Sequence, residues 1–147
     1  MDIDQVLGRL RRMAAELGLP FGDRKMTYNS RPAQELGKWA ETRGLGEASH
    51  WAAFKAYFGD GLNIYRNEVL AGIAKSLGLD PVAATGVLEN GEFREAVAQD
   101  WSRARDLGVS VVPTFAIDGE FMEGAHPYEA MAALMNRHGV ALRKEQP

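Results

Sequence analysis

Apolar residues recur every three or four positions along most of the chain, which is the spacing of helices with one buried face. The first such helix is expected over residues 3–17, because Gly18 and Pro20 follow it. The remaining helices are expected over residues 31–43, 47–58, 70–77, 81–88, 93–107 and 127–138. The pattern therefore predicts a mostly helical chain.

The spacing changes to two between residues 109 and 117, where β-branched and aromatic residues prevail. Asp118 and Gly119 follow, a pair that two-residue hairpin turns favour because both central positions take positive φ. Residues 120–123 are expected to form the return strand. The sequence thus predicts one β-hairpin near the end of the chain.

Two helix starts carry local signals. Pro32 falls in the first turn of its helix, where the missing N–H costs nothing. Asp80 directly precedes Pro81 and is expected to be an N-cap.

An aromatic group occupies the middle of the helical region. Its members follow helical spacing, so we expect them in the core rather than in a ligand-binding box. They are Trp39, Trp51, Phe54, Tyr57 and Phe58.

Composition narrows the class of protein. The 147 residues, of which 46% are hydrophobic, suit one domain with its own core, and no repeat or linker divides them. A net charge of −3 argues against nucleic-acid binding, and no apolar run approaches the ~18 residues of a membrane span. The chain contains no cysteine, which excludes disulfides, thiolate metal sites and thiol nucleophiles within these residues. The start of the sequence is unlike a secretory signal, and we expect a cytoplasmic protein.

Most candidate catalytic patterns fail on spacing. The histidines at positions 50, 126 and 138 do not form a metal-binding pattern. Ser49 and His50 are neighbours on a predicted helix and point about 100° apart, so they cannot act as a nucleophile and its base. We therefore assign no catalytic residue and no metal ligand.

Pro113 lies inside a predicted strand, although proline cannot donate a hydrogen bond to a ladder. The residues themselves leave three explanations open: an edge strand, a bulge, or a cis Val112–Pro113 bond. A cis bond would offer the Val112 backbone to an extended substrate.

Residues 108–119, Gly-Val-Ser-Val-Val-Pro-Thr-Phe-Ala-Ile-Asp-Gly, resemble the cis-proline segment of the thioredoxin superfamily and, more narrowly, of its DsbA-like branch. Residues 124–129 resemble the helix start that follows this segment. Upstream, residues 29–33 and 54–64 resemble the helical insertion of FrnE-like and 2-hydroxychromene-2-carboxylate isomerase-like members. The resemblance covers nearly the whole chain and implies that the Val112–Pro113 bond is cis.

The resemblance implies an α/β thioredoxin-like (DsbA-like) fold that is mostly α here, with an incomplete thioredoxin sheet. We expect one DsbA-like domain over residues 1–147, made of a helical insertion (about 1–107), the C-terminal half of the thioredoxin fold (about 108–138) and a frayed tail (139–147). Family members carry Cys-x-x-Cys, or a serine in the isomerase-like branch, in a β-α-β unit that we expect this chain to lack.

The resemblance implies a polypeptide of the thiol–disulfide oxidoreductase type, truncated and inactive in redox chemistry on its own. Two alternatives stay open: a non-catalytic module that binds a peptide or thiol, and part of a glutathione-dependent isomerase-like enzyme. No cofactor is expected, except glutathione in the isomerase-like alternative. The implied substrate-binding residues are Val112, Pro113 and Asn29.

The predicted hairpin would present an unpaired strand edge. We therefore expect a homo-oligomer, or a partner chain, that covers this edge. A peptide or small thiol is the expected substrate, and neither nucleic acid nor a membrane is an expected partner.

Overall fold

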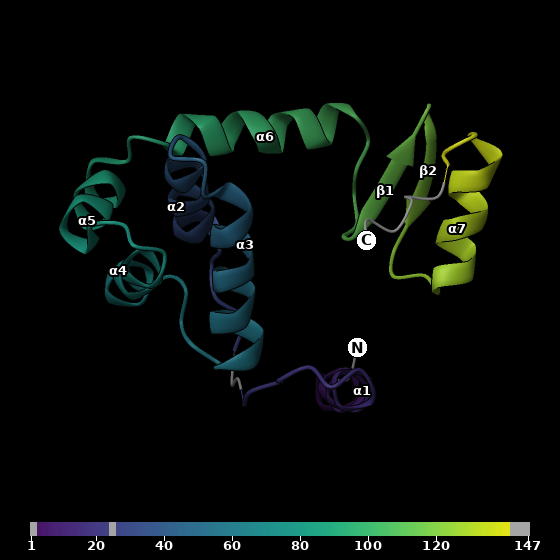
Figure 1. Cartoon of the computed structure of the whole chain (residues 1–147), viewed down its shortest axis with the longest axis horizontal. Coiled ribbons are helices and arrows are strands. Elements are labelled where there is room, and N and C mark those ends of the chain that lie inside the picture. Colours follow the sequence, from purple (N-terminus) through teal and green to yellow (C-terminus); the bar gives the residue numbers. More distant parts are fainter. Residues whose placement is uncertain (1–2, 24–25, 142–147) are drawn as a thin grey trace, which may run out of the picture. The chain divides into compact units, whose positions relative to one another are not determined.

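The computed structural model describes residues 3–23 and 26–141. Seven α-helices and one short π-helix occupy most of these residues, and one β-hairpin lies between the last two helices (Figure 1). The predicted architecture, a mostly helical chain with a late hairpin, is confirmed. The elements group into two compact units, Met1–Asp100 and Trp101–Pro147. The expected division of one domain into residues 1–107 and 108–138 stays a prediction.

The first unit holds the predicted helices, with ends that differ from the prediction by a few residues. Asp80 caps its helix as expected, because its side chain accepts a hydrogen bond from the Val82 amide at 2.9 Å. None of the helices among the described residues has the length and apolar character needed to cross a membrane. The elements are α1 (Ile3–Glu16), α2 (Arg31–Glu41), α3 (Gly46–Phe54), the π-helix η1 (Lys55–Gly59), α4 (Asn67–Ser76), α5 (Pro81–Asn90) and α6 (Arg94–Asp106), which continues into the second unit.

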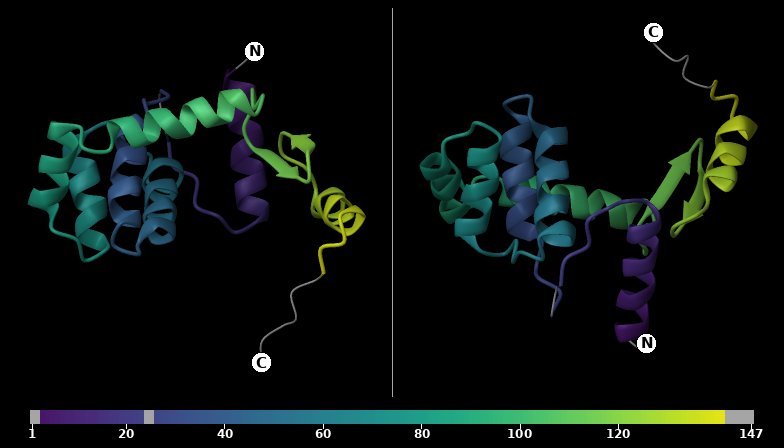
Figure 2. Two further views of the ribbon diagram at one scale, coloured as in Figure 1. Left: turned by 90° about the horizontal axis from the view of Figure 1, so that it is seen from above. Right: turned by 60° about the horizontal axis from the view of Figure 1, so that its bottom comes forward.

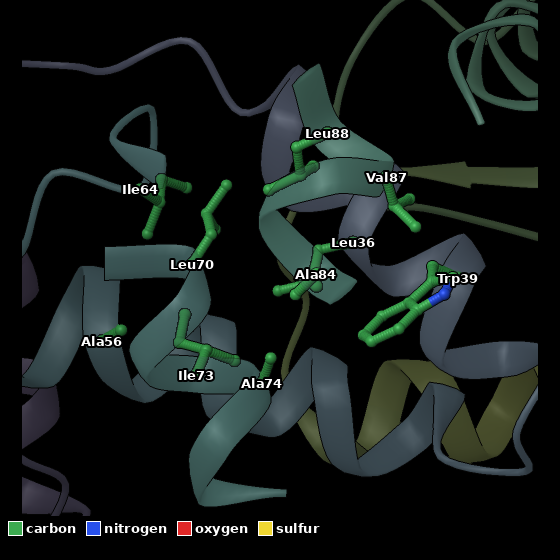
Figure 3. Packing of buried hydrophobic residues seen from close by; sticks show 10 residues of the cluster. All are labelled: Leu36, Trp39, Ala56, Ile64, Leu70, Ile73, Ala74, Ala84, Val87 and Leu88. Carbon is green, nitrogen blue, oxygen red and sulfur yellow. The ribbon is translucent and has the colours of Figure 1, made fainter. Parts of the chain in front are cut away.

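The core of the first unit lies where α2, α4 and α5 pack against one another, with η1 beside them (Figures 2 and 3). Trp39 is 3% exposed, so its predicted place in the core is confirmed. The buried cluster consists of Leu36, Trp39, Ala56, Ile64, Leu70, Ile73, Ala74, Ala84, Val87 and Leu88.

Three of the other aromatic residues are not buried, which corrects the prediction. Trp51, Phe54 and Phe58 are 68%, 56% and 40% exposed. The opposite stripe of α3 and η1 carries small residues, and of these Ser49 and Ala56 are buried. Small side chains let neighbouring helices approach closely, so this stripe faces the core and the aromatic stripe does not. The fourth residue, Tyr57, is half-buried and packs its ring edge-on against Tyr28, with the centroids 6.4 Å apart.

The exposed aromatic stripe forms one wall of an apolar groove of about 460 Å³ in the first unit. The other walls come from α1 and the segment that follows it. This segment is held close to the end of η1: the Gly22 amide donates to the Phe58 carbonyl at 2.8 Å. A Cβ on Gly22 would lie 2.5 Å from the Gly59 carbonyl oxygen, so this approach requires glycine.

The second unit contains the antiparallel strands β1 (Thr114–Ile117) and β2 (Glu120–Glu123), followed by α7 (Tyr128–Arg137). The hairpin turn is confirmed, since Asp118 and Gly119 have φ values of 47° and 83°. The first strand is shorter than predicted, because residues 109–113 lie outside it. The partner strand β2 has only four residues, so the described residues provide no ladder for 109–112.

An ion pair and contacts of His138 join the end of α7 to the hairpin within the second unit. Glu120 pairs with Arg137 and, at 2.8 Å, with Nε2 of His138, while Nδ1 of His138 lies 3.3 Å from Asp118. Leu134 is the buried hydrophobic residue of α7. Of the predicted frayed tail, 139–147, residues 142–147 lie outside the described residues.

Candidate functional site

The segment that leads into β1 is the most exposed part of the predicted site. Val112 is 88% exposed, and the Val112–Pro113 peptide bond is cis. The neighbours of Val112 are held locally, because Thr114 Oγ1 donates to the Val111 carbonyl and the Gly124 amide donates to the Pro113 carbonyl, each at 2.7 Å. Among the described residues, no hydrogen bond reaches the backbone N–H or C=O of Val112. This backbone is therefore available to a ligand.

The register of the hairpin extends this free backbone along β1. The hydrogen bond from Gly124 to Pro113 makes these two residues a bonded pair, and bonded pairs alternate along an antiparallel ladder. Phe115 and Ile117 consequently bond to β2, whereas the N–H and C=O groups of Thr114 and Ala116 face the other way. These groups form one edge of β1; together with the exposed Val112 backbone just before the strand, they are called the outer edge below.

The charges beside the hairpin are mostly acidic and partly compensated. Hydrogen bonds from Arg137 and then His138 lower the pKa of Glu120 below its ordinary value. These contacts lie on the β2 and α7 side of the unit. At the outer edge of β1, a ligand would therefore be bound through backbone N–H and C=O groups.

Asn29, the third predicted residue, belongs to the first unit, so its place near Val112 and Pro113 stays a prediction. Its side-chain oxygen accepts a hydrogen bond from the Arg31 amide at 2.9 Å, just before α2 begins. Asn29 also lines a polar cavity of about 570 Å³ inside the first unit.

The histidines have local partners or lie on the surface. His138 pairs with the hairpin, and Nε2 of His126 lies 2.9 Å from the Glu123 carbonyl oxygen. His50 is exposed and lies against the ring of Phe54. Among residues 3–23 and 26–141, no group of three or more histidine, aspartate or glutamate side chains could hold a metal ion.

Glu35 and Arg94 line the polar cavity and were not identified from the sequence. Glu35 is only 4% exposed although glutamate is an ionisable residue. Helical spacing held one signal for it, since Glu35 precedes the core residue Trp39 by four positions and so shares its side of α2. For Arg94, an exposed arginine at a helix start, the sequence held no comparable signal.

Comparisons with known proteins found a family model and a similar solved structure that each cover most of the chain. A family model described as "DSBA-like thioredoxin domain" matches residues 2–136. A solved structure of selenomethionine 2-hydroxychromene-2-carboxylate isomerase (HCCA isomerase) is similar, with a TM-score of 0.78 and 23% sequence identity. The match covers 93% of this chain and 66% of the isomerase chain, so this chain spans less than two thirds of the isomerase's length. None of the curated proteins matches the chain.

Proposed function

Since the chain belongs to the family of DSBA-like thioredoxin domains, we propose that it binds an extended thiol compound, a peptide or glutathione, along the outer edge of β1. The predicted DsbA-like fold is confirmed by the same match and by the likeness to the isomerase. In this proposal Val112 and Pro113 are binding residues, and the location is the cytoplasm, where thiol compounds are kept reduced.

The observation that carries the proposal is that Val112 is 88% exposed and that no hydrogen bond reaches its backbone among the described residues. An extended peptide gains affinity by adding main-chain hydrogen bonds to an unpaired strand edge. Thr114 and Ala116 offer such groups two residues apart, which matches the repeat of an extended ligand, and the Val112 backbone adds its groups just before the strand. Glutathione is a short peptide with a free thiol, so it belongs to this ligand class.

The proposal includes no thiol–disulfide exchange by this chain's own residues. Such exchange requires attack by a thiolate, and the 147 residues contain no cysteine. The sulfur of the bound compound would keep its oxidation state unless another polypeptide supplied a thiol.

The second candidate is a part in a glutathione-dependent isomerase-like enzyme. Its support is the similarity to HCCA isomerase together with the lack of cysteine. An isomerisation changes no overall oxidation state, so it needs no pair of cysteines. The Val112 backbone would then hold part of the glutathione.

The binding proposal is tested by titrating the ¹⁵N-labelled chain with S-methylglutathione and following the backbone amides by NMR. We expect saturable shifts at Val112, Thr114 and Ala116, and small shifts at Phe115 and Ile117, because these two amides already bond to β2. Shifts that ignore this alternation, or that do not saturate, would contradict the proposal.

Two matched measurements separate binding from chemistry. Val112→Pro removes one free N–H and is expected to weaken binding, whereas Val82→Ala, which changes a valine of α5 that is also largely exposed, leaves binding unchanged. An insulin-reduction assay of the chain is expected to show no activity, and measurable reduction would exclude the redox-inactive assignment.

The same edge underlies our proposal about partners. An uncovered strand edge templates pairing with another chain, so we propose that a second copy pairs there when no ligand is bound. Light scattering after size-exclusion chromatography is expected to show a mass that rises with concentration and falls on addition of S-methylglutathione. A monomer at every concentration would contradict this proposal.

A further inference from the structure

The polar cavity of the first unit lies at the starts of three helices. Its walls come from the first two turns of α2, the starts of α4 and α6, the residues just before α2 and α4, and one residue of α5. Its volume of about 570 Å³ falls within the range of small-molecule sites, roughly 300–1,000 Å³. Helix starts present free N–H groups and a positive dipole end, which favour an anionic group nearby.

Glu35 places a carboxyl group in this cavity. Whereas the helix starts favour an anionic group of a ligand, this carboxyl favours a cationic one. The residue is 4% exposed, and among the described residues no hydrogen bond or ion pair reaches its carboxyl group. Buried polar groups in native proteins are almost always paired, so an unpaired one indicates a missing partner such as an ion, a water or a ligand. A cationic group that donates hydrogen bonds is the partner that a glutamate carboxyl favours.

Arg94 places an unpaired guanidinium in the same cavity. Its side chain folds back over Gly91, where a Cβ would lie 2.9 Å from Arg94 Cζ, and it makes no ion pair with the described residues. Arg66 differs, because Glu68 lies 3.3 Å from its Nε and offsets its charge. Besides Arg31 and the Arg66–Glu68 pair, the cavity is thus lined by one buried carboxyl, Glu35, and one guanidinium, Arg94, that do not pair with each other.

We propose that this cavity binds a small zwitterion, a molecule with one ammonium and one carboxylate group. The ammonium donates hydrogen bonds to the Glu35 carboxyl, and the carboxylate accepts them from Arg94. Pro32 and Leu88 supply apolar wall for the carbon skeleton between the two groups. The site uses residues of the first unit alone, so it does not depend on ligand binding at Val112.

Two zwitterions with different charge separations, L-leucine and 6-aminohexanoate, serve as probes in calorimetry and in amide NMR. We expect at least one of them to bind and to shift amides near Glu35, Arg66 and Arg94. The derivatives that lack one charge, N-acetyl-L-leucine and L-leucinamide for the first probe, should bind at least tenfold more weakly. Equal binding of either derivative overturns the proposal, and so does the absence of binding by both zwitterions.

Variants assign the charges. Glu35→Gln and Arg94→Gln should each weaken binding of the zwitterion at least tenfold, while Glu92→Gln, which changes an exposed glutamate outside the cavity, should not. Arg94 is exposed, so its variant tests the site even if Glu35→Gln does not fold. If a double-mutant cycle without ligand shows that Glu35 and Arg94 stabilise the fold as a pair, the two side chains are partners of each other and the proposal is wrong.

Discussion

The two compact units are stabilised in different ways. The first buries a contiguous cluster of ten residues from four helical elements and the segment before α4, whereas Leu134 is the one buried hydrophobic residue among the described residues of the second. The second unit depends instead on a tight turn, on the ion pair between Glu120 and Arg137 of α7, and on the hydrogen bond between Glu120 and His138. The difference indicates that the first unit carries most of the folding free energy, while the second leaves a strand edge free for a ligand or a second chain.

The largest effect is expected from a substitution that creates a cavity in the core of the first unit. Leu70 is fully buried, so Leu70→Ala should lower the free energy of unfolding by about 2–5 kcal/mol. Urea denaturation followed by tryptophan fluorescence measures this loss, since Trp39 lies in the same cluster.

Two substitutions provide the comparison. Val82→Ala changes a side chain that is 77% exposed and should stay within about 0.5 kcal/mol of the unchanged chain. Leu134→Ala should cost less than Leu70→Ala, because fewer buried neighbours surround Leu134. An equal cost for the two leucines would refute the contrast between the units.

Sequence patterns predicted those features that local chemistry determines. The turn at Asp118–Gly119 and the cap at Asp80 each follow from one or two residues, and both are confirmed. The helices follow from the spacing of apolar residues along the chain, which indicates that each helix has one apolar face.

Spacing could not identify which of two faces would be buried. In α3 and η1 the aromatic stripe and the small-residue stripe both fit a helix, and only packing against neighbouring helices selects the small one. In the same way, residues 109–112 have strand composition but find no partner strand among the described residues, and a partner is a property of the whole fold. The cavity charges Glu35 and Arg94 lie far apart in sequence, so only the fold brings them together.

A smaller loss is expected from the turn on which the second unit depends. Gly119 has a φ of 83°, and Gly119→Ala forces a side chain into the left-handed region at a cost of roughly 1–2 kcal/mol. Amide hydrogen exchange in β1 and β2 should accelerate accordingly.

Gly72→Ala is the matched control in the first unit. Gly72 lies within α4 and has open space around its Cα, so alanine should stabilise that helix by up to about 1 kcal/mol. Unchanged exchange in the hairpin of Gly119→Ala would show that the turn does not hold the second unit together.

Acid should loosen the second unit. The pKa of Glu120 is lowered in the folded chain, chiefly by the hydrogen bond from Arg137 and next by that from His138. Its contribution is therefore complete above the ordinary glutamate pKa of about 4.3 and is lost as the pH falls through the lower folded value. Amide exchange in β2 should rise in that acidic range, and Arg137→Gln should shift the NMR titration of the Glu120 carboxyl to higher pH. A Glu120 titration that ignores Arg137→Gln would contradict this assignment.

The smallest effect is expected from an ion pair in the first unit. Lys38 Nζ lies 2.8 Å from an Asp100 carboxylate oxygen, and the two side chains are 31% and 55% exposed. Water screens such a pair, so Lys38→Gln should cost no more than about 1 kcal/mol at neutral pH, within the range of exposed pairs. Urea denaturation in a double-mutant cycle with Asp100→Asn isolates the pair, and Lys75→Gln, at an exposed lysine of α4, is the control.

The pH dependence of this pair has the opposite sign to that of Glu120. The hydrogen bond to Asp100 is the main cause that raises the pKa of Lys38, against a smaller lowering by burial. The contribution is therefore complete below the ordinary lysine pKa of about 10.4 and is lost as the pH rises through the folded value. A coupling energy as large as the loss in Leu70→Ala would mean that charge, and not burial, holds α6 to α2, and the contrast between the two units would then no longer hold.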